Sequence, residues 1–164
     1  MSFVSQRGVN DALRFHAAFF ALAIPVALYE QGRSLGLAIL LLAALYNITL
    51  PLMCQWRGHR DGVRLWMFLL PLSMALPCAD WMLVSRMGTL RFPGHGVYRL
   101  GGVVPLYFMG LWIMLLWPLC WLAQATRRPY LLTAFGALAA FLIWEWAARP
   151  MHLWHAVGVR QIAG

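Results

Sequence analysis

The stretch VVPLYFMGLWIMLLWPLCWLA, residues 103–123, runs for 21 residues without a charged side chain. A helix of about 20 apolar residues matches the roughly 30 Å hydrocarbon core of a bilayer. Three further stretches, 35–53, 65–79 and 131–144, are almost as apolar. The sequence therefore predicts an integral membrane protein.

The composition leaves little room for anything outside the membrane. Of the 164 residues, 62% are hydrophobic and 11% are charged, which suits about five membrane crossings and no soluble domain. We therefore expect an all-α, polytopic transmembrane helix bundle in which residues 1–164 form one membrane domain. The polar residues 1–11 lack the features of a cleavable secretory signal, so we expect the first helix to be retained.

Turn signals divide the chain into separate helices. The charged segment RGHRDG at 57–62 predicts a tight hairpin, and Pro129 suits the first turn of a helix. The longest connection, 85–101, holds four glycines and Pro93 and exceeds what a helix hairpin needs. It is either a functional loop or a loose surface loop. The expected helices are 12–29, 35–56, 63–84, 102–124 and 130–148.

All 13 basic residues are arginines, and most of them flank the apolar spans. Such an excess of positive charge in a soluble domain would suggest nucleic acid. At the ends of apolar spans it indicates membrane topology and contact with lipid headgroups instead, so no nucleic-acid partner is expected. Five helices would place seven arginines on the N-terminal side and six on the other, and the clusters in the short turns favour a cytoplasmic N-terminus.

Two acids lie inside or beside the predicted spans. Asp80 falls near the end of the third helix and Glu145 falls late in the fifth, so alternating topology brings both to the same side of the membrane. An acid near hydrocarbon is costly unless it is paired or protonated, which makes it a functional candidate. Both are therefore candidate catalytic acids that point into the bundle, and the structural alternative is an ion pair with Arg86 or Arg149.

Tryptophans inside the spans suggest an aromatic-lined pocket. Pro105 and Pro118 interrupt the fourth helix where tryptophans are densest, and a proline opens backbone packing. Ordinary packing of large side chains is the alternative. Asn47, in the middle of the second span, is either a further pocket residue or a hydrogen-bond link to a neighbouring helix. The candidate substrate-binding residues are Trp112, Trp117, Trp144, Trp146 and Asn47, around an elongated cavity closed by Glu145.

Metal or haem binding is a weaker hypothesis. His152 and His155 share one helical face and His16 lies inside the first span, but no carboxylate or cysteine completes a ligand set. The three cysteines show no paired spacing. We therefore expect no metal and no cofactor.

A resemblance rests on short pieces of sequence in a fixed order. The pieces are DWML from Asp80, GTLRFP from Gly88, Pro105, Leu111-Trp112 and Trp121-Leu122. Their order resembles a family of small, uncharacterised bacterial inner-membrane proteins, and this implies location in a bacterial inner membrane. Glu145, followed nine residues later by Trp154, is similar to membrane-embedded isoprenoid cyclases of the lycopene-cyclase and meroterpenoid-cyclase type, which implies an acid that protonates an alkene or epoxide.

Two functions of different classes remain open. As an enzyme or binding protein, the bundle would hold a membrane lipid or isoprenoid among its tryptophans, with Asp80 or Glu145 as a protonated acid that drives cyclisation or isomerisation without a cofactor. As an accessory or scaffold subunit, it would dock its apolar faces on another membrane protein or on a second copy of itself. Hydrolase triads and phosphate-binding loops are absent from the sequence.

Overall fold

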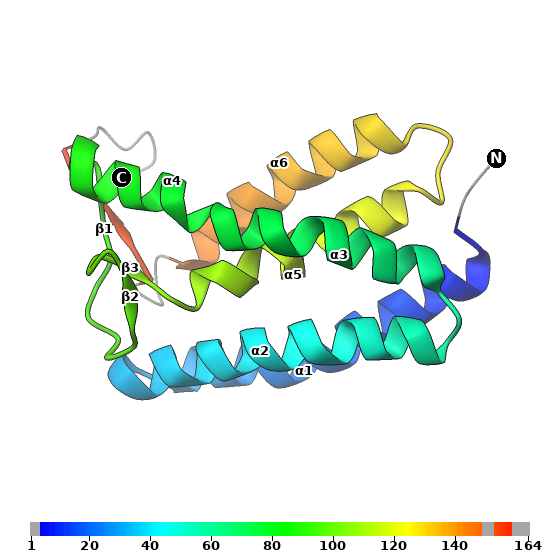
Figure 1. Cartoon of the computed structure of the whole chain (residues 1–164), viewed down its shortest axis with the longest axis horizontal. Helices are drawn as coiled ribbons and strands as arrows, with labels where there is room; N and C mark the ends of the chain where they lie inside the picture. The colour runs from blue at the N-terminus through cyan, green and yellow to red at the C-terminus, as the bar shows by residue number, and fades with distance from the viewer. Residues whose placement is uncertain (1–3, 149–152, 159–164) are drawn as a thin grey trace.

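The computed structural model describes residues 4–148 and 153–158, and it is an all-α bundle of the membrane type (Figure 1). Two long helices, α1 and α2, form one layer. A second layer holds the remaining helices, and short strands close one end of the bundle (Figure 1). The elements are α1 Gln6–Tyr29, α2 Gly32–Trp56, α3 Arg60–Ala75, α4 Pro77–Met82, the π-helix η1 Leu83–Met87, α5 Phe108–Ala123, α6 Pro129–Ala148, and the strands β1 Leu90–Arg91, β2 Arg99–Leu100, β3 Val104–Pro105 and β4 His155–Ala156.

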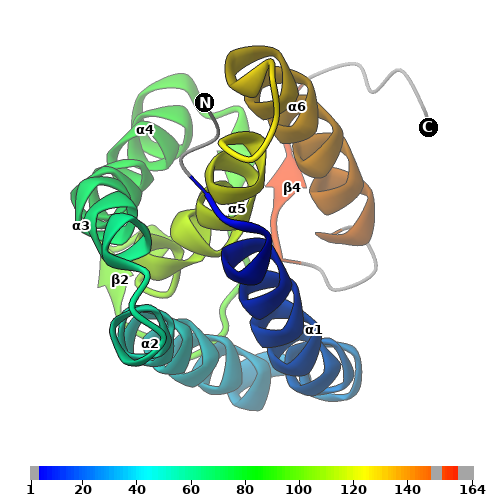
Figure 2. The same cartoon turned by 90° about the vertical axis from the view of Figure 1, so that its right-hand side faces the viewer.

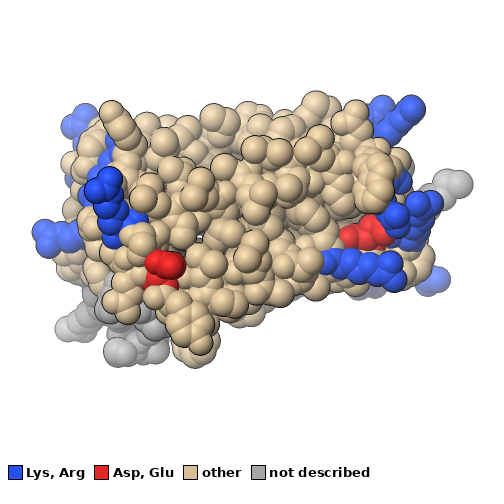
Figure 3. All heavy atoms as spheres, turned by 90° about the horizontal axis from the view of Figure 1, so that it is seen from below, with Lys and Arg blue, Asp and Glu red and all other residues tan. Residues whose placement is uncertain are grey.

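The lengths of the helices fit a bilayer. Within the described residues, four helical spans are long and apolar enough to cross a membrane: Gln6–Tyr29, Gly32–Trp56, Arg60–Met87 and Pro129–Trp146. On the face seen in Figure 3, charged side chains gather at the two ends and leave an apolar band between them. This distribution is that of a protein whose middle lies in hydrocarbon.

Helix α5 is the centre of the bundle (Figure 2). It packs against α1, α2, α3 and α6, and its residues Ile113 and Trp117 are completely buried. Ser73 links α3 to α5. The Ser73 hydroxyl donates to the Met109 carbonyl at 3.2 Å and accepts from the Ile113 amide at 3.2 Å. At 16 residues α5 is about 24 Å long, shorter than a full span.

The fourth helix starts later than the sequence predicts, at Phe108 rather than at residue 102. Gly101 and Gly102 take left-handed backbone angles, with φ of 56° and 77°, which only glycine adopts easily. They form the turn between β2 and β3, which pair antiparallel with Leu100 opposite Val104. The third helix, in turn, continues to Met87 through α4 and η1, and Pro77, which has no amide hydrogen, marks the break between α3 and α4.

The long connection between η1 and α5 is packed against the bundle. Phe92, His95 and Tyr107 are buried, and a methyl group at Gly36 of α2 would clash with the His95 carbonyl oxygen. The C-terminal strand β4 pairs antiparallel with β1, Leu90 opposite Ala156. The interpretation as a loose surface loop is therefore wrong for this segment.

We expect the order of this connection to depend on pH through His95. Its ring Nδ1 lies 2.9 Å from the Tyr107 hydroxyl, and burial, together with the positive charge of Arg99, lowers the pKa of His95. The unfolded segment then binds a proton at a higher pH than the folded one, so the stability from neutral His95 is full above about pH 6.5 and is lost as the pH falls. Amide hydrogen exchange of residues 88–107, corrected for intrinsic rates, should be faster at about pH 5 than at about pH 8.

His95→Gln is the matched variant, because an amide can still pair with Tyr107 but does not titrate in this range. Its exchange should change less with pH than that of the wild type. Equal corrected exchange at both pH values in the wild type would contradict the assignment to His95.

Candidate functional site

A lateral groove runs along the bundle between α1 and α6. It has a volume of about 500 Å3 and is lined only by apolar side chains. Helices α2 and α5 contribute to it from behind, and Leu153, which precedes β4, also lines it. Its lining residues are Phe20, Ala23, Ile24, Ala27, Leu28, Ile39, Leu42, Leu111, Met114, Trp144, Trp146 and Leu153.

Small residues on α1 create the space. The α1 residues in the lining recur three and four positions apart and so share one helix face. Ala23 and Ala27 lie on this face, and their short side chains leave the gap that a leucine at either position would occupy. From Phe20 to Leu28 this face extends for about 12 Å along the helix. Ile24 and Leu28 are largely exposed and Trp146 is 75% exposed, so the groove is open on its outer side.

A smaller hollow of about 100 Å3 adjoins the groove. It shares Phe20, Leu111, Met114 and Trp144 with it and is completed by residues that include Trp112. The Trp112 ring contacts Phe141 of α6 with ring centroids 5.0 Å apart. Its Nε1 is buried and has no hydrogen-bond partner within the described residues. Three of the expected tryptophans, Trp112, Trp144 and Trp146, therefore line this connected apolar space.

Glu145 lies beside one end of the groove but not inside the bundle. Its neighbours Trp144 and Trp146 line the groove, whereas its own side chain is exposed. Its Oε2 accepts a hydrogen bond of 3.2 Å from Trp154 Nε1, and the Trp154 ring lies 6.2 Å from that of Trp144. The expectation that this acid points inward is wrong, because the pair with Trp154 holds it at the outer edge. Arg149, the expected ion-pair partner, lies outside the described residues.

Asp80 lies in α4, the short helix that directly precedes the π-helix η1. Its carboxyl group is half-buried, and Oδ2 is enclosed without a hydrogen-bond partner among the described residues. No ion pair with Arg86 is found in that part of the chain; the Arg86 guanidinium instead lies 5.9 Å from the ring of Trp81. No hydrogen bond joins Asp80 to Glu145 in the described ranges, and neither acid is among the residues that line the groove or the smaller hollow.

Trp117 and Asn47, two of the expected pocket residues, do not line the groove and instead make contacts between helices. Trp117 is completely buried, donates from Nε1 to the Gly62 carbonyl at 3.0 Å and stacks on His16 and Trp121, so it lies in solid core and lines neither hollow. Asn47 donates to the carbonyls of Ala43 and Gly110 and accepts from Trp66 Nε1. It therefore links α2 to α5 and α3.

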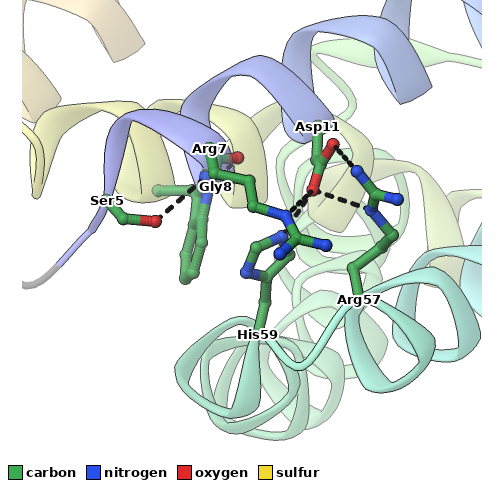
Figure 4. Close-up of polar contacts among 7 residues, drawn as sticks. Ser5, Arg7, Gly8, Asp11, Arg57 and His59 are labelled. Atoms are coloured by element: carbon green, nitrogen blue, oxygen red, sulfur yellow. Dashed lines mark hydrogen bonds and ion pairs between the residues drawn. The ribbon is translucent and has the colours of Figure 1, made fainter.

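A polar network at the other end of the bundle was not expected from the sequence. The carboxylate of Asp11, on α1, is 6% exposed and accepts two hydrogen bonds from Arg57, of 2.9 Å from Nε and 2.7 Å from Nη2. His59 Nε2 lies 2.9 Å from Asp11 Oδ2, and Arg7 approaches from the same helix at 3.9 Å. Figure 4 shows Asp11 surrounded by these groups.

This network ties α1 to the α2–α3 turn. Because the Arg57 guanidinium donates hydrogen bonds to the negatively charged Asp11 carboxylate, the pKa of Arg57 is raised. Nearby, Trp121 Nε1 donates to the Gly8 carbonyl at 3.1 Å, so α5 is held to the same end of α1. The sequence did contain a signal for this network. An aspartate lies in the first turns of an apolar helix, four residues after Arg7. An arginine and a histidine lie in the turn between the second and third helices, which is on the same side of the membrane.

Of the histidines considered as metal or haem ligands, His16 is engaged on both sides of its ring within the core. Both ring nitrogens of His16 are engaged, Nδ1 with the Ala12 carbonyl at 2.7 Å and Nε2 with the Tyr46 hydroxyl at 2.8 Å. His155 lies in β4, and His152 lies outside the described residues. No group of three or more metal-binding side chains is found in the described ranges.

The C-terminal half of the chain matches the model of a known protein family. The model of the domain of unknown function DUF6989 matches residues 77–164, which is more than half of the sequence. The chain belongs to the DUF6989 family. Neither a curated protein nor a solved structure matches it significantly.

The DUF6989 match starts at Pro77, the first residue of α4. It therefore includes Asp80, the packed connection, α5, α6 and Glu145. In this DUF6989 protein the part of the groove formed by α5, α6 and Leu153 lies within the matched region, and the part formed by α1 and α2 precedes it. Membership agrees with the resemblance to an uncharacterised family.

Proposed function

We propose that this protein binds the hydrocarbon chain of a membrane-resident lipid or isoprenoid in the groove between α1 and α6. The observation that carries the proposal is an apolar space of about 500 Å3 that is open on the side where lipid tails would lie. Ligand sites are typically concave, largely apolar and of about this size. A chain could enter sideways from the bilayer without crossing a polar barrier.

In this proposal the polar end of the ligand lies at the Glu145–Trp154 pair. These two residues adjoin Trp144, Trp146 and Leu153, which line that end of the groove. The carboxyl group of Glu145 is then the acid nearest to a reactive end, and the tryptophan faces could stabilise a developing positive charge. This is the acid-catalysed, cyclase-like form of the proposal, with a bacterial inner membrane as the location.

Filling the groove tests the binding proposal. Ala27→Trp places an indole in the lining of the groove, and we expect it to exclude the ligand. Ala21→Trp is the matched control, because Ala21 lies on an exposed face of the same helix and lines no part of the groove. Mass spectrometry of lipids that co-purify with each variant should find one enriched chain-bearing species in the wild type and in A21W, reduced at least about tenfold in A27W.

The same lipid composition in all three proteins would refute the groove as the site. The catalytic form has its own variant, Glu145→Gln, which keeps the shape and removes the transferable proton. It should retain the enriched lipid in unreacted form. Recovery of an identical product pattern from E145Q would remove Glu145 as the acid and leave binding intact.

A scaffold function is the second candidate, and the exposed apolar face of α6 favours it. Leu138, Leu142 and Ile143 are each more than half exposed. Co-purification of a membrane protein in fixed stoichiometry, without an enriched lipid, would place this function first.

A further inference from the structure

A further hollow, apart from the groove and the smaller space beside it, lies at the turn between α5 and α6, at the end of the bundle where α1 begins (Figure 1). It has a volume of about 470 Å3, and it is lined by Thr126, Arg127, Arg128, Leu131, Leu132 and Phe135. One side of the hollow is thus cationic and the other is apolar.

The two arginines are available for an external anion. Arg127 and Arg128 are exposed, and none of the ion pairs found within the described residues includes either of them. Thr126 donates its hydroxyl to the Ala123 carbonyl at 2.7 Å, so it shapes the turn. Two adjacent guanidinium groups favour a phosphate, because each can donate more than one hydrogen bond to its oxygens.

The apolar side continues down α6 into the membrane band. Leu131 and Leu132 lie in the first turn of α6, directly after the two arginines, and Phe135 follows Leu131 by four positions, so Leu131 and Phe135 share one face of the helix. All three are about half exposed or more. A ligand that fits both sides carries a phosphate at one end and a hydrocarbon chain that runs parallel to α6.

We propose that this hollow binds the headgroup of an anionic phospholipid, with the phosphate at Arg127 and Arg128 and an acyl chain along Leu131 and Phe135. A soluble phosphate would satisfy the arginines but would leave the apolar side empty. The site is separate from the groove, because the two have no lining residue in common. The two proposals can therefore fail independently.

The test compares two double variants of the full-length protein. Arg127→Gln with Arg128→Gln removes both guanidinium groups from the hollow. Arg60→Gln with Arg64→Gln removes the same charge from the exposed start of α3, at the same end of the bundle and outside the hollow. Native mass spectrometry then measures retention of phosphatidylglycerol and of phosphatidylcholine, each added separately, and inorganic phosphate serves as a soluble competitor.

We expect the wild type and the R60Q/R64Q protein to retain phosphatidylglycerol over phosphatidylcholine. The R127Q/R128Q protein should lose at least about tenfold of this preference, because both guanidinium groups that would pair with the lipid phosphate are removed. Inorganic phosphate should not displace the lipid. Equal losses in the two double variants would show diffuse attraction and overturn the site. Full displacement by inorganic phosphate would overturn the lipid as its ligand.

Discussion

Trp117→Ala is expected to lower the free energy of unfolding by about 3–5 kcal/mol, the range for removing a buried large aromatic side chain. Trp117 is completely buried, and its ring stacks between His16, at 5.7 Å, and Trp121, at 5.2 Å. The alanine variant also leaves the Gly62 carbonyl without the indole donor, and an unsatisfied buried acceptor adds to the loss. Denaturant or thermal unfolding in detergent measures it.

Two variants separate packing from hydrogen bonding at this position. Trp117→Phe keeps an aromatic ring but removes the donor to Gly62, so it should lose less than the alanine variant. Trp56→Ala is the control, because Trp56 is 84% exposed and its ring lies beside the Arg57 guanidinium at 5.9 Å. Its loss of stability should be about 1 kcal/mol or less. Equal stability of W117A and W56A would contradict the central role of Trp117.

Asp11→Asn is expected to give the largest loss of stability among the acids of the described chain. The asparagine keeps the shape but not the charge, so Arg57 and His59 lose the carboxylate between them. Breaking an enclosed charge pair from one side is strongly destabilising because the partner is left uncompensated. The melting temperature should fall by several degrees, and the contact of α1 with the α2–α3 turn should loosen.

Asp61→Asn is the matched control at the same end of the bundle. Asp61 also pairs with an arginine, Arg64 at 2.9 Å, but these side chains are 54% and 74% exposed, and exposed pairs contribute about 1 kcal/mol or less. The double variant of Asp11→Asn with Arg57→Gln should be less destabilised than the sum of the two single variants, because they remove one shared interaction. Additive losses, or equal melting temperatures for D11N and D61N, would argue against the network.

The helix spans were predictable because bilayer thickness and composition dictate them. Residues 35–56 are apolar almost throughout, and the structure has α2 at Gly32–Trp56. Boundaries set by long-range contact were less predictable. The segment 102–107 looks helical by composition, yet part of it forms β3, which pairs antiparallel with β2. Two glycines allow the turn between these strands, and local hydrophobicity does not reveal such a turn.

The candidate site was only partly predictable for a similar reason. Trp144 and Trp146 were identified from their place inside an apolar span, and they line the groove. Trp117 has the same sequence character but faces the core, since the face that a tryptophan presents depends on where α5 packs. Asp11 was overlooked because its partners Arg57 and His59 are 46 and 48 positions away.

By itself the sequence determined that this chain is a membrane helix bundle, where its spans lie, and which few polar groups occur within or beside them. These properties follow from hydrophobicity and length, which each segment carries alone. Only the tertiary structure decided that the space between α1 and α6 stays open, that Glu145 lies at its edge beside Trp154, and that Asp11 joins two distant turns. These properties depend on how separate helices approach one another, and the physical reason is that a cavity or an ion pair belongs to several segments at once.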